Sequence, residues 1–475
     1  MPLKESFRAE LTRIAGADGV IDTAAGLSVY ECDGYTLERA RPEIVLLPRT
    51  TAEVAMLVQA CVRARVPFVP RGAGTGVSGG CLPADIPVMI ATTRMRAIRR
   101  IDFANREIEV EAGVVNLAVT RAAASADLHY APDPSSQAAC SIGGNIAENS
   151  GGPHTLKYGV TVNHLLGVEL VAPDGEVLRL DRSAGSPGYD LAGLVCGSEG
   201  TFGIVTAATL RLTPNPEAVL TLLAVFPSVL SASRAVSSII AAGIVPAALE
   251  MMDALVIEAV EQAYHFGFPA DAGAALIVEL DGLAVSLDDL SERIKRCCRE
   301  AGASDVRRAA TSAERELLWK SRKRAFGAMG RLTKAYCTQD GVVPRSRLPE
   351  IVAIIDECAA RHHLRIANLM HAGDGNIHPL ILYDDDDAEE IRHAIEAGNE
   401  ILSACVRLGG SLSGEHGIGV EKIGLLAEAF SGDEIEAMVD VKSAFNTEGL
   451  CNPHKIFPTD RHCVEVVRPR PRGGG

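Results

Sequence analysis

The sequence predicts an α+β protein of at least two domains. Its 475 residues exceed the length at which one hydrophobic core usually divides into separate domains. Strand-like apolar runs such as 220–226 alternate with helical stretches such as 228–241, which is typical of mixed structure. The apolar runs 165–171 and 177–180 flank a Pro-Asp-Gly turn, so we expect part of the sheet to be antiparallel.

The first predicted elements lead into a glycine-rich loop. A short strand at 44–47 precedes Thr50-Thr51-Ala52-Glu53, which fits a capping box at the start of a helix. Apolar residues at helical spacing over 54–62 continue that helix. A second strand begins at Phe68 and runs directly into the loop 71–80.

The clearest break between domains is Thr213-Pro-Asn-Pro216, because prolines interrupt helices and central strands. We expect one unit before this break and a second α+β unit after it. The acidic run Asp384–Asp387 is interpreted as a solvated loop or a helix start. The tail 461–475 is predicted to be disordered.

The composition argues against several classes of protein. With 46 basic and 61 acidic residues, the formal net charge is −15, which argues against broad nucleic-acid binding. No apolar run of about 18 residues predicts a membrane span, and residues 1–10 lack the apolar segment of a secretory signal. The 12 cysteines contain no C-x-x-C, so no iron–sulfur cluster held by this chain alone is expected. We expect reduced thiols and a cytoplasmic location.

The sequence Gly74-Thr-Gly76-Val-Ser-Gly79 matches the G-x-G-x-x-G pattern of dinucleotide-binding folds. That fold needs a helix to begin inside the motif, but Pro83 and Pro87 follow and would break it, so we reject this interpretation. The alternatives that remain are a backbone cradle for an anion such as pyrophosphate and a plain turn. Two further loops rich in Gly, Asn and Ser, at 141–152 and 197–205, favour a ligand.

The segment from His371 to His378 contains Asp374-Gly375, a dipeptide typical of two-residue hairpin turns. With that turn at the centre, the two histidines would be direct cross-strand neighbours on one face. Facing imidazoles can share a divalent metal ion, and Glu415, which lies in Ser-Gly-Glu-His-Gly, would complete a site with an open coordination position. Zinc is expected first, with manganese or iron as alternatives.

Other polar residues are less informative. Arg322 lies in a basic stretch whose simplest interpretation is a solvated helix face, and the alternative is a bidentate clamp for a substrate carboxylate. Six histidines show no partner pattern and are interpreted as structural: His129, His154, His164, His265, His362 and His363.

These motifs together resemble a known family, the FAD-linked 2-hydroxy-acid dehydrogenases, whose FAD-binding domain is of the vanillyl-alcohol oxidase (PCMH) type. The resemblance extends from about residue 43 to residue 458. It is carried by the loop 71–80, Pro132–Ser136, Gly143–Gly152, Gly197–Val205, Tyr336–Pro344, His371–His378 and Ser411–Lys422.

The resemblance implies four segments: an N-terminal helical segment at 1–42, a FAD-binding domain of two subdomains at 43–216, an α+β substrate or cap domain at 217–410, and a helical segment at 411–460 that completes the active site. Non-covalent FAD is implied, because Thr75 stands where members with covalent flavin often carry His. The implied FAD-binding residues are Pro70, Arg71, Gly72, Ala73, Gly74, Thr75, Gly76, Ser78, Gly79, Pro132, Asp133, Ser136, Gly143, Gly144, Asn145, Ala147, Asn149, Gly151, Gly152, Tyr158, Gly159, Glu199, Gly200, Gly203, Ile204, Val205 and Asn452.

The resemblance also implies a chemistry, in which a metal assists proton abstraction from a short 2-hydroxy acid and a hydride passes to flavin N5. By motif, the implied residues are His371, His378 and Glu415 as metal ligands, His416 as the base and Arg322 as the carboxylate-binding arginine. Members that oxidise 2-hydroxyglutarate carry Lys where this chain has Thr338 and Asn where it has Leu380. A second carboxylate would be poorly paired here, so glycolate, oxidised to glyoxylate, is the first expectation.

The family further implies partners that reoxidise the flavin: a second FAD-binding-type subunit and an iron–sulfur subunit, which would bring the chain to the inner face of the membrane. Three alternatives remain open. They are a stand-alone D-lactate dehydrogenase that forms pyruvate, a non-catalytic flavin-binding subunit, and a zinc hydrolase with incidental glycine-rich loops. The complete set of metal-type ligands argues against the non-catalytic subunit.

Overall fold

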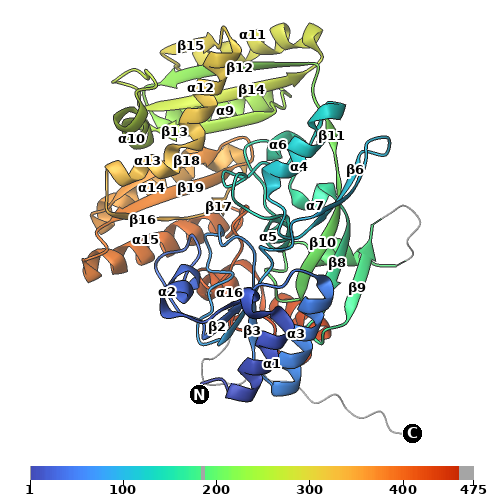
Figure 1. Cartoon of the computed structure of the whole chain (residues 1–475). Coiled ribbons are helices and arrows are strands. Elements are labelled where there is room, and N and C mark those ends of the chain that lie inside the picture. The colour runs from blue at the N-terminus through green and yellow to red at the C-terminus, as the bar shows by residue number, and fades with distance from the viewer. Residues whose placement is uncertain (1, 183–187, 459–475) are drawn as a thin grey trace.

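A computed structural model describes residues 2–182 and 188–458 of the chain. The described residues build sheets of four, five, two and eight strands, with helices packed against them. Figure 1 shows the largest sheet and its helices above the smaller sheets, with the N-terminal elements at the bottom. The mixed α+β class predicted from the sequence is confirmed. The predicted disordered tail 461–475 lies outside the described residues.

The first sheet has the order β1-β2-β4-β3, in which β4 runs parallel to both β2 and β3. Its strands are β1 (Val20–Ile21), β2 (Ile44–Leu46), β3 (Phe68–Arg71) and β4 (Val88–Ala91). Helix α3 (Thr51–Ala64) connects β2 to β3 and packs with α1 (Glu5–Ala15) against the sheet. Thr50 caps α3 as predicted, since its side chain accepts the N–H of Glu53. The glycine-rich loop therefore follows the end of a buried strand.

The second sheet is antiparallel and has the order β5-β6-β10-β8-β9. Its strands are β5 (Ile98–Asp102), β6 (Glu107–Glu111), β8 (Leu165–Val171), β9 (Val177–Asp181) and β10 (Ile204–Arg211). Strands β8 and β9 form the predicted hairpin, with Val171 opposite Val177. Helices α4 (Asn116–Ala123), α5 (Ile142–Glu148) and α8 (Leu191–Val195) share its apolar core. The short pair β7 (Leu128–His129) and β11 (Thr213–Pro214) lies beside it.

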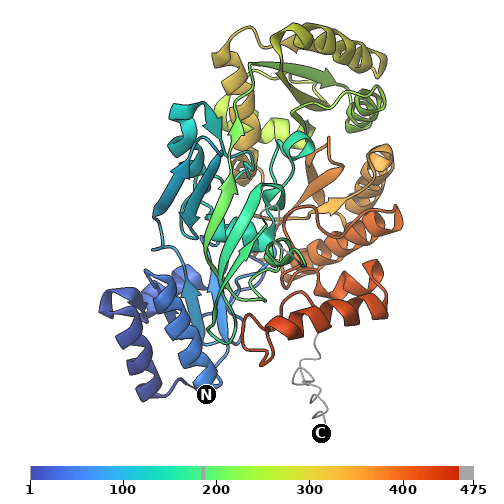
Figure 2. The ribbon, with the colours of Figure 1, turned by 90° about the vertical axis from the view of Figure 1, so that its right-hand side faces the viewer.

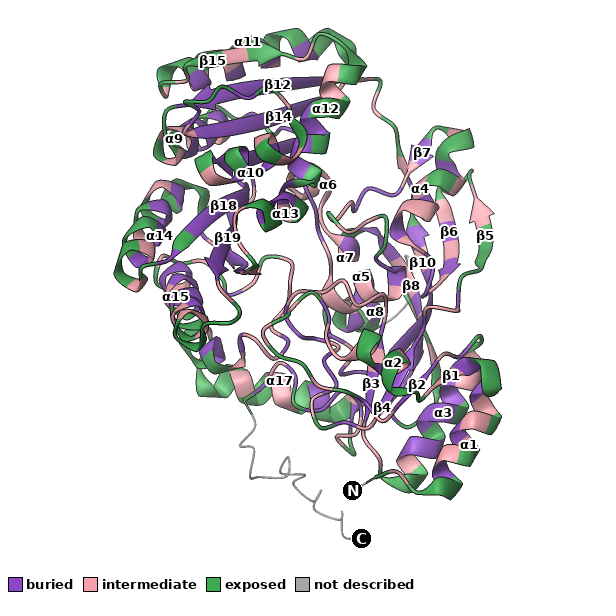
Figure 3. Cartoon of the chain, turned by 60° about the vertical axis from the view of Figure 1, so that its left-hand side comes forward, coloured by how far each residue is buried: buried purple, intermediate pink, exposed green. Residues whose placement is uncertain are grey.

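The third sheet has the order β15-β12-β14-β13-β18-β19-β16, and β17 also pairs with β19. Its strands are β12 (Ala218–Phe226), β13 (Ala248–Asp253), β14 (Ala274–Gly282), β15 (Asp305–Arg308), β16 (Ala335–Thr338), β17 (Gly341–Val342), β18 (Arg365–His371) and β19 (Asn376–Tyr383). The helices α9 (Val229–Ala241), α11 (Ala284–Glu300), α14 (Leu348–His362) and α15 (Ala388–Arg407) cover one face. The helices α10 (Ala254–Tyr264), α12 (Ser312–Lys323) and α13 (Ala325–Ala328) cover part of the other. Figure 3 shows that the strands are buried and the outer helix faces exposed.

The last described segment returns to the N-terminal half of the molecule, as Figure 2 shows. It contains α16 (Leu426–Ala429) and α17 (Gly432–Phe445). Phe445 stacks on Phe202 with 4.7 Å between the ring centres. The backbone of Cys451 forms an isolated parallel β-bridge with that of Phe68 in β3. Three shorter helices lie in connections between strands. Helix α2 (Ala24–Leu27) lies between β1 and β2, and α6 (Thr155–Tyr158) and α7 (Thr161–His164) lie between β7 and β8.

The predicted register of the β18–β19 hairpin is wrong. His371 pairs with Asn376 and Leu369 with His378, so the connection has four residues, Ala372–Gly375, instead of two. A two-residue Asp-Gly turn of the usual hairpin type needs positive φ at both positions, but only Gly375 has it, at 77°. The pairing is shifted by an even number of residues, so His371 and His378 still lie on the same face, as diagonal neighbours.

Candidate active site

A cavity of about 740 Å³ lies where the glycine-rich loop, the second sheet and the third sheet meet. From the predicted set, it is lined by Pro70, Arg71, Gly72, Ala73, Gly74, Thr75, Gly76, Ser136, Gly143, Gly144, Asn145, Ala147, Glu199, Gly200, Gly203, Ile204, Val205, His371, Glu415 and His416. One continuous space therefore contacts both the glycine-rich loops and the polar cluster of the third sheet. This arrangement suits a long ligand with an anionic end and a reacting end.

The glycine-rich loop reaches this cavity without a following helix, which agrees with our rejection of the Rossmann fold. Gly74 has a φ of 72°, and a Cβ there would collide with Arg71, whose guanidinium lies under the loop. Arg71 is buried and donates from Nη1 to the carbonyl oxygen of Cys32 at 3.0 Å. The backbone of residues 72–76 can thus approach a ligand closely, as an anion cradle requires.

The remaining predicted FAD-binding residues do not belong to the cavity lining: Ser78, Gly79, Pro132, Asp133, Asn149, Gly151, Gly152, Tyr158, Gly159 and Asn452. Several of them brace the loops that do. Ser78 Oγ donates to the carbonyl oxygen of His416 at 2.8 Å, and Asn452 Nδ2 donates to the carbonyl oxygens of Gly80 and Glu199. Asp133 instead pairs with His154, 2.9 Å from Nδ1.

The three predicted metal ligands come together. Glu415 Oε1 lies 3.2 Å from His371 Nε2 and 3.4 Å from His378 Nε2. The two imidazole rings are 5.1 Å apart at an angle of 90°, and one ligand atom from each residue lies within 4.8 Å of the others. The Glu415 pKa lies well below its usual range, because the two histidines outweigh the effect of burial. Two histidines and a carboxylate at these distances fit a divalent ion with open positions.

Glu250 of β13 orients the first histidine. Its Oε1 lies 2.8 Å from His371 Nδ1, so the opposite ring nitrogen faces Glu415. Burial lowers the pKa of His371, but the carboxylates of Glu250 and Glu415 outweigh it and raise the pKa to about 10. Arg322 of α12 is fully buried and its Nε lies 2.7 Å from Glu250 Oε2. Its Nη1 and Nη2 have no hydrogen-bond partner among the described residues, so two NH2 groups remain available in this region.

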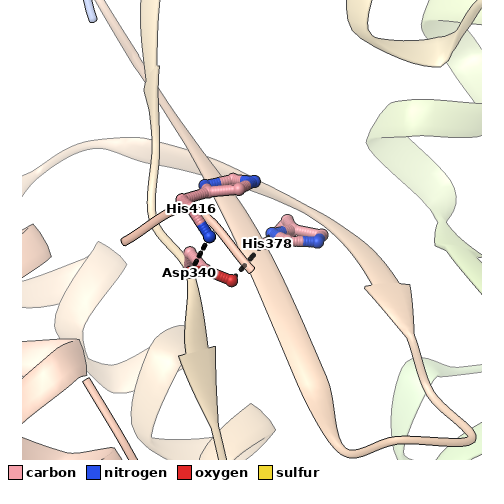
Figure 4. Close-up of side chains that lie close together, drawn as sticks. All are labelled: Asp340, His378 and His416. Carbon is pink, nitrogen blue, oxygen red and sulfur yellow. Dashed lines mark hydrogen bonds and ion pairs between the residues drawn. The ribbon is translucent and has the colours of Figure 1, made fainter. Parts of the chain in front are cut away.

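Asp340, which follows β16, holds the loop that carries Glu415 and His416. Its Oδ2 accepts the backbone N–H groups of Gly414 at 2.9 Å and His416 at 2.9 Å. Its Oδ1 lies 3.8 Å from His378 Nδ1, and Figure 4 shows the carboxylate joined by dashed lines to the backbone nitrogen of His416 and to the His378 ring. Burial raises the pKa of Asp340, but His416, the buried Lys422 and His378 together lower it. A buried anion thus fixes the loop from the side of the third sheet.

His416 lines the cavity. Its ring stacks on that of His378 with 4.8 Å between centres, and its Nδ1 has no hydrogen-bond partner among the described residues. Burial lowers its pKa to about 4, Asp340 opposing this change and His378 adding to it. An unprotonated histidine with a free ring nitrogen can accept a proton at neutral pH.

Sequence reasoning did not find Glu250 and Asp340, and it did not find that Glu199 holds the loop after His416. Glu199 lines the cavity, but it was predicted only as a FAD-binding residue; its carboxylate accepts the N–H groups of Ile418 and Gly419, both at 2.7 Å. Each of these acids lies far along the chain from the loop or histidine that it holds. Their burial was the missing information, and an acid inside an otherwise apolar strand, as at Glu250, is the one signal that could have indicated it.

Comparisons with known proteins agree with this geometry. A family model described as a FAD binding domain matches residues 42–181, and one described as FAD linked oxidases, C-terminal domain, matches residues 215–456. The glycolate oxidase subunit GlcD of Escherichia coli (strain K12) is 48% identical over 447 residues, which cover 94% of this chain and 90% of that protein. This chain belongs to the FAD-linked oxidases. It is an oxidoreductase that uses FAD.

A second relative and a solved structure agree with these findings. The glycolate oxidase subunit GlcD of Bacillus subtilis (strain 168) is 37% identical over 96% of this chain and 98% of its own length. The structure of 4-ethylphenol oxidase from Gulosibacter chungangensis superposes with a TM-score of 0.79, at 17% identity, over 96% of this chain and 98% of that one, which shows the shared fold. Within the described residues, no helix is long and apolar enough to cross a membrane.

Proposed function

We propose that this chain is the substrate-oxidising subunit of a glycolate-oxidising complex and converts glycolate to glyoxylate. The observation that carries this proposal is the single cavity that joins the glycine-rich loops to Glu415 and His416. The 48% identity to a protein named as a glycolate oxidase subunit supports the choice of substrate. When bound, FAD would supply the capacity to accept the two electrons of the oxidation.

The residues fit both groups that this activity needs. The backbone of 72–76 offers N–H groups to the pyrophosphate of a non-covalent FAD, and Gly143 and Gly144 offer surfaces without side chains to the cofactor. His371, His378 and Glu415 would hold a divalent metal, zinc first, which would supply Lewis acidity to the substrate hydroxyl.

Two side chains would provide proton transfer and binding of the substrate carboxylate. His416 Nδ1 has no hydrogen-bond partner among the described residues and burial lowers the pKa of the ring, so we propose that His416 takes the hydroxyl proton of glycolate. We propose that the free Nη groups of Arg322 bind the substrate carboxylate and so fix its orientation. Arg322 is buried and is not part of the cavity lining, so this contact requires a local rearrangement of side chains.

The cavity favours a short monocarboxylate. Thr338 lines it, and Leu380 is the direct cross-strand neighbour of Thr338 on the same face. Leu380 is fully buried and apolar, so this pair offers no cation to a second carboxylate. We also propose that the reduced flavin is reoxidised through a second FAD-binding-type subunit and an iron–sulfur subunit, which place the complex at the inner face of the membrane.

The test is an anaerobic titration of the visible spectrum of the purified, FAD-loaded chain with glycolate, in parallel with D-lactate. We expect glycolate to bleach the flavin band in a single turnover and to half-saturate at the lower concentration. If D-lactate bleaches the band at lower concentration than glycolate, D-lactate and not glycolate is the substrate. A flavin band that neither acid bleaches, after metal has been added back, would contradict the proposal that this chain is the oxidising subunit.

A further inference from the structure

The helices α14 and α15 bring a thiol, an imidazole and a carboxylate together, away from the cavity. Cys358 and His362 are one turn apart on α14, so both side chains lie on the same helix face. Glu400 lies on α15, which packs against α14. One ligand atom from each of the three residues lies within 4.8 Å of the others. Cys358 belongs to the apolar core on the face of the third sheet opposite to the histidine pair.

The distances are close to those of a metal site. His362 Nε2 lies 3.1 Å from Glu400 Oε2, and two such ligands about 2.0 Å from one tetrahedral zinc ion would lie about 3.3 Å apart. Arg361 binds the other oxygen, Oε1, so the carboxylate is held while Oε2 remains directed at His362. The Cys358 thiol interacts with Glu400 and makes a weak contact, 3.7 Å from the carbonyl oxygen of Ala397, which it can give up.

The cluster has a route to solvent and room for a fourth ligand. The side chains of His362 and Glu400 are 15% and 28% exposed, whereas Cys358 is buried, so an ion can enter from the outer side and meet the thiol last. His393 lies on α15 two turns before Glu400, and its ring centre is 5.9 Å from that of His362. The fourth position is therefore open to water or to His393.

We propose that Cys358, His362 and Glu400 form a second divalent-metal site, suited to Zn²⁺, that links α14 to α15. Binding breaks the S–H bond of Cys358, forms a metal–sulfur bond and releases the proton to solvent, without any change of oxidation state. The mixed sulfur, nitrogen and oxygen ligand set favours zinc over magnesium or calcium. Because α15 is followed by the segment that carries Glu415 and His416, the metal would fix a helix that precedes the active-site loop.

The ion has to compete with a proton at this site. Burial and the neighbouring Glu400 raise the pKa of the Cys358 thiol to about 11. The site at His371, His378 and Glu415 contains no thiol, so a metal probe that reports sulfur ligation separates the two sites.

The test uses the FAD-loaded full chain, freed of metal with a chelator and kept reduced without added thiols. Cobalt(II) is titrated in, and the difference spectrum is followed for the near-ultraviolet thiolate-to-cobalt charge-transfer band. The variants are Cys358→Ser and His362→Gln. The matched controls are Cys297→Ser, a half-buried cysteine of α11 outside the cluster, and Glu396→Gln, an exposed acid of α15.

We expect the charge-transfer band to saturate when one cobalt ion per chain is bound to thiolate, within a total of up to two bound cobalt ions. The band should disappear in Cys358→Ser and require at least tenfold more cobalt in His362→Gln. Both controls should give the band of the unaltered chain, and added Zn²⁺ should abolish it by displacement. Failure of the unaltered chain to develop the band would overturn the proposal, as would a band that persists in Cys358→Ser. This readout is independent of glycolate oxidation, so the proposed function can fail without affecting it.

Discussion

The Oδ2 atom of Asp340 accepts a hydrogen bond from the backbone N–H of His416 at 2.9 Å. The same oxygen accepts the hydroxyl of Ser413 at 2.7 Å and lies 3.4 Å from the ammonium group of Lys422, and all of these groups are buried or half-buried. One carboxylate therefore satisfies several loop donors at once, which a neutral side chain cannot do. The position of the proposed base, His416, thus depends on Asp340, which lies in the connection between β16 and β17.

Replacing Asp340 should damage both stability and activity. In Asp340→Asn the buried Lys422 loses its anionic partner, and breaking a buried ion pair costs about 3–5 kcal/mol. The loop donors also lose acceptor capacity, so glycolate turnover should fall at least 100-fold in the protein that still folds. Urea unfolding and steady-state assays measure the two effects. Asp386→Asn, at an exposed acid that pairs with Lys334, is the control and should change neither.

Removing the proposed base should leave cofactor binding intact. In His416→Gln we expect the flavin content of the unaltered chain, because the loops 72–76 and 143–145 are unchanged, and a loss of turnover of about 10²–10⁴-fold. Flavin absorbance per chain and anaerobic reduction rates measure both. A variant that reduces its flavin at the original rate would exclude His416 as the base.

The proposed metal ligands should lose metal without losing flavin. Glu415→Gln removes the carboxylate that lies 3.2 and 3.4 Å from the two histidine nitrogens, so tightly bound divalent metal and activity should fall together. Chelation of the unaltered chain should reproduce the loss, and zinc or manganese should restore activity to the chelated chain but not to the variant. Glu428→Gln, an exposed acid on α16, serves as the control. Full activity in a metal-free preparation would contradict the metal proposal.

Substrate preference should respond to the residue at 338. Thr338→Lys places a cation at a cavity-lining position, and a hydrogen bond to a charged group contributes about 1.5–3 kcal/mol. We expect the ratio of kcat/KM for 2-hydroxyglutarate to that for glycolate to rise at least tenfold. Thr338→Met, which introduces a side chain similar in length to lysine but without its charge, should not raise this ratio. An unchanged ratio in both variants would show that residue 338 does not face the distal part of the substrate.

The sequence was sufficient to predict the class of the fold and the local elements whose causes are local. The cap at Thr50 and the hairpin at Val171 and Val177 follow from residues that are adjacent along the chain. The β18–β19 register was wrong because it depends on the backbone conformation of Asp374, which the dipeptide alone does not determine. The prediction that His371 and His378 share one face was still correct, because a shift by an even number of residues keeps side chains on the same face.

The parts of the site that sequence reasoning missed are those made by long-range burial. Asp340 meets His416 across 76 residues, and Glu250 meets His371 across 121 residues. Asp340 carries no local pattern that differs from that of a solvated acid, and Glu250 differs only in its apolar strand, because the roles of both arise only when another segment covers them. The same holds for His362, which was interpreted as structural until the packing of α14 on α15 placed Glu400 beside it.

Stability should decrease at alkaline pH because of His154. Its Nδ1 lies 2.9 Å from Asp133 and its Nε2 lies 3.3 Å from Glu279 of the third sheet, so a protonated ring joins the two halves of the molecule. Burial lowers the pKa of His154, but Asp133 and Glu279 outweigh it and raise the pKa to about 10. A raised folded-state pKa stabilises fully below the unfolded value of about 6.5, and this stabilisation is lost as pH rises toward 10.

We expect the unaltered chain to lose on the order of 2 kcal/mol between pH 7 and pH 10 from this group, since one pKa unit corresponds to about 1.4 kcal/mol and solvent at the partly exposed ring screens the interaction. His154→Gln should be less stable at pH 7 and should show a flatter decline toward pH 10, because the uncharged amide has no proton to lose. His265→Asn, at an exposed position with left-handed backbone, is the control and should follow the unaltered chain. The measurement is the urea midpoint at each pH, and parallel declines in all three proteins would show that His154 is not charged in the folded state.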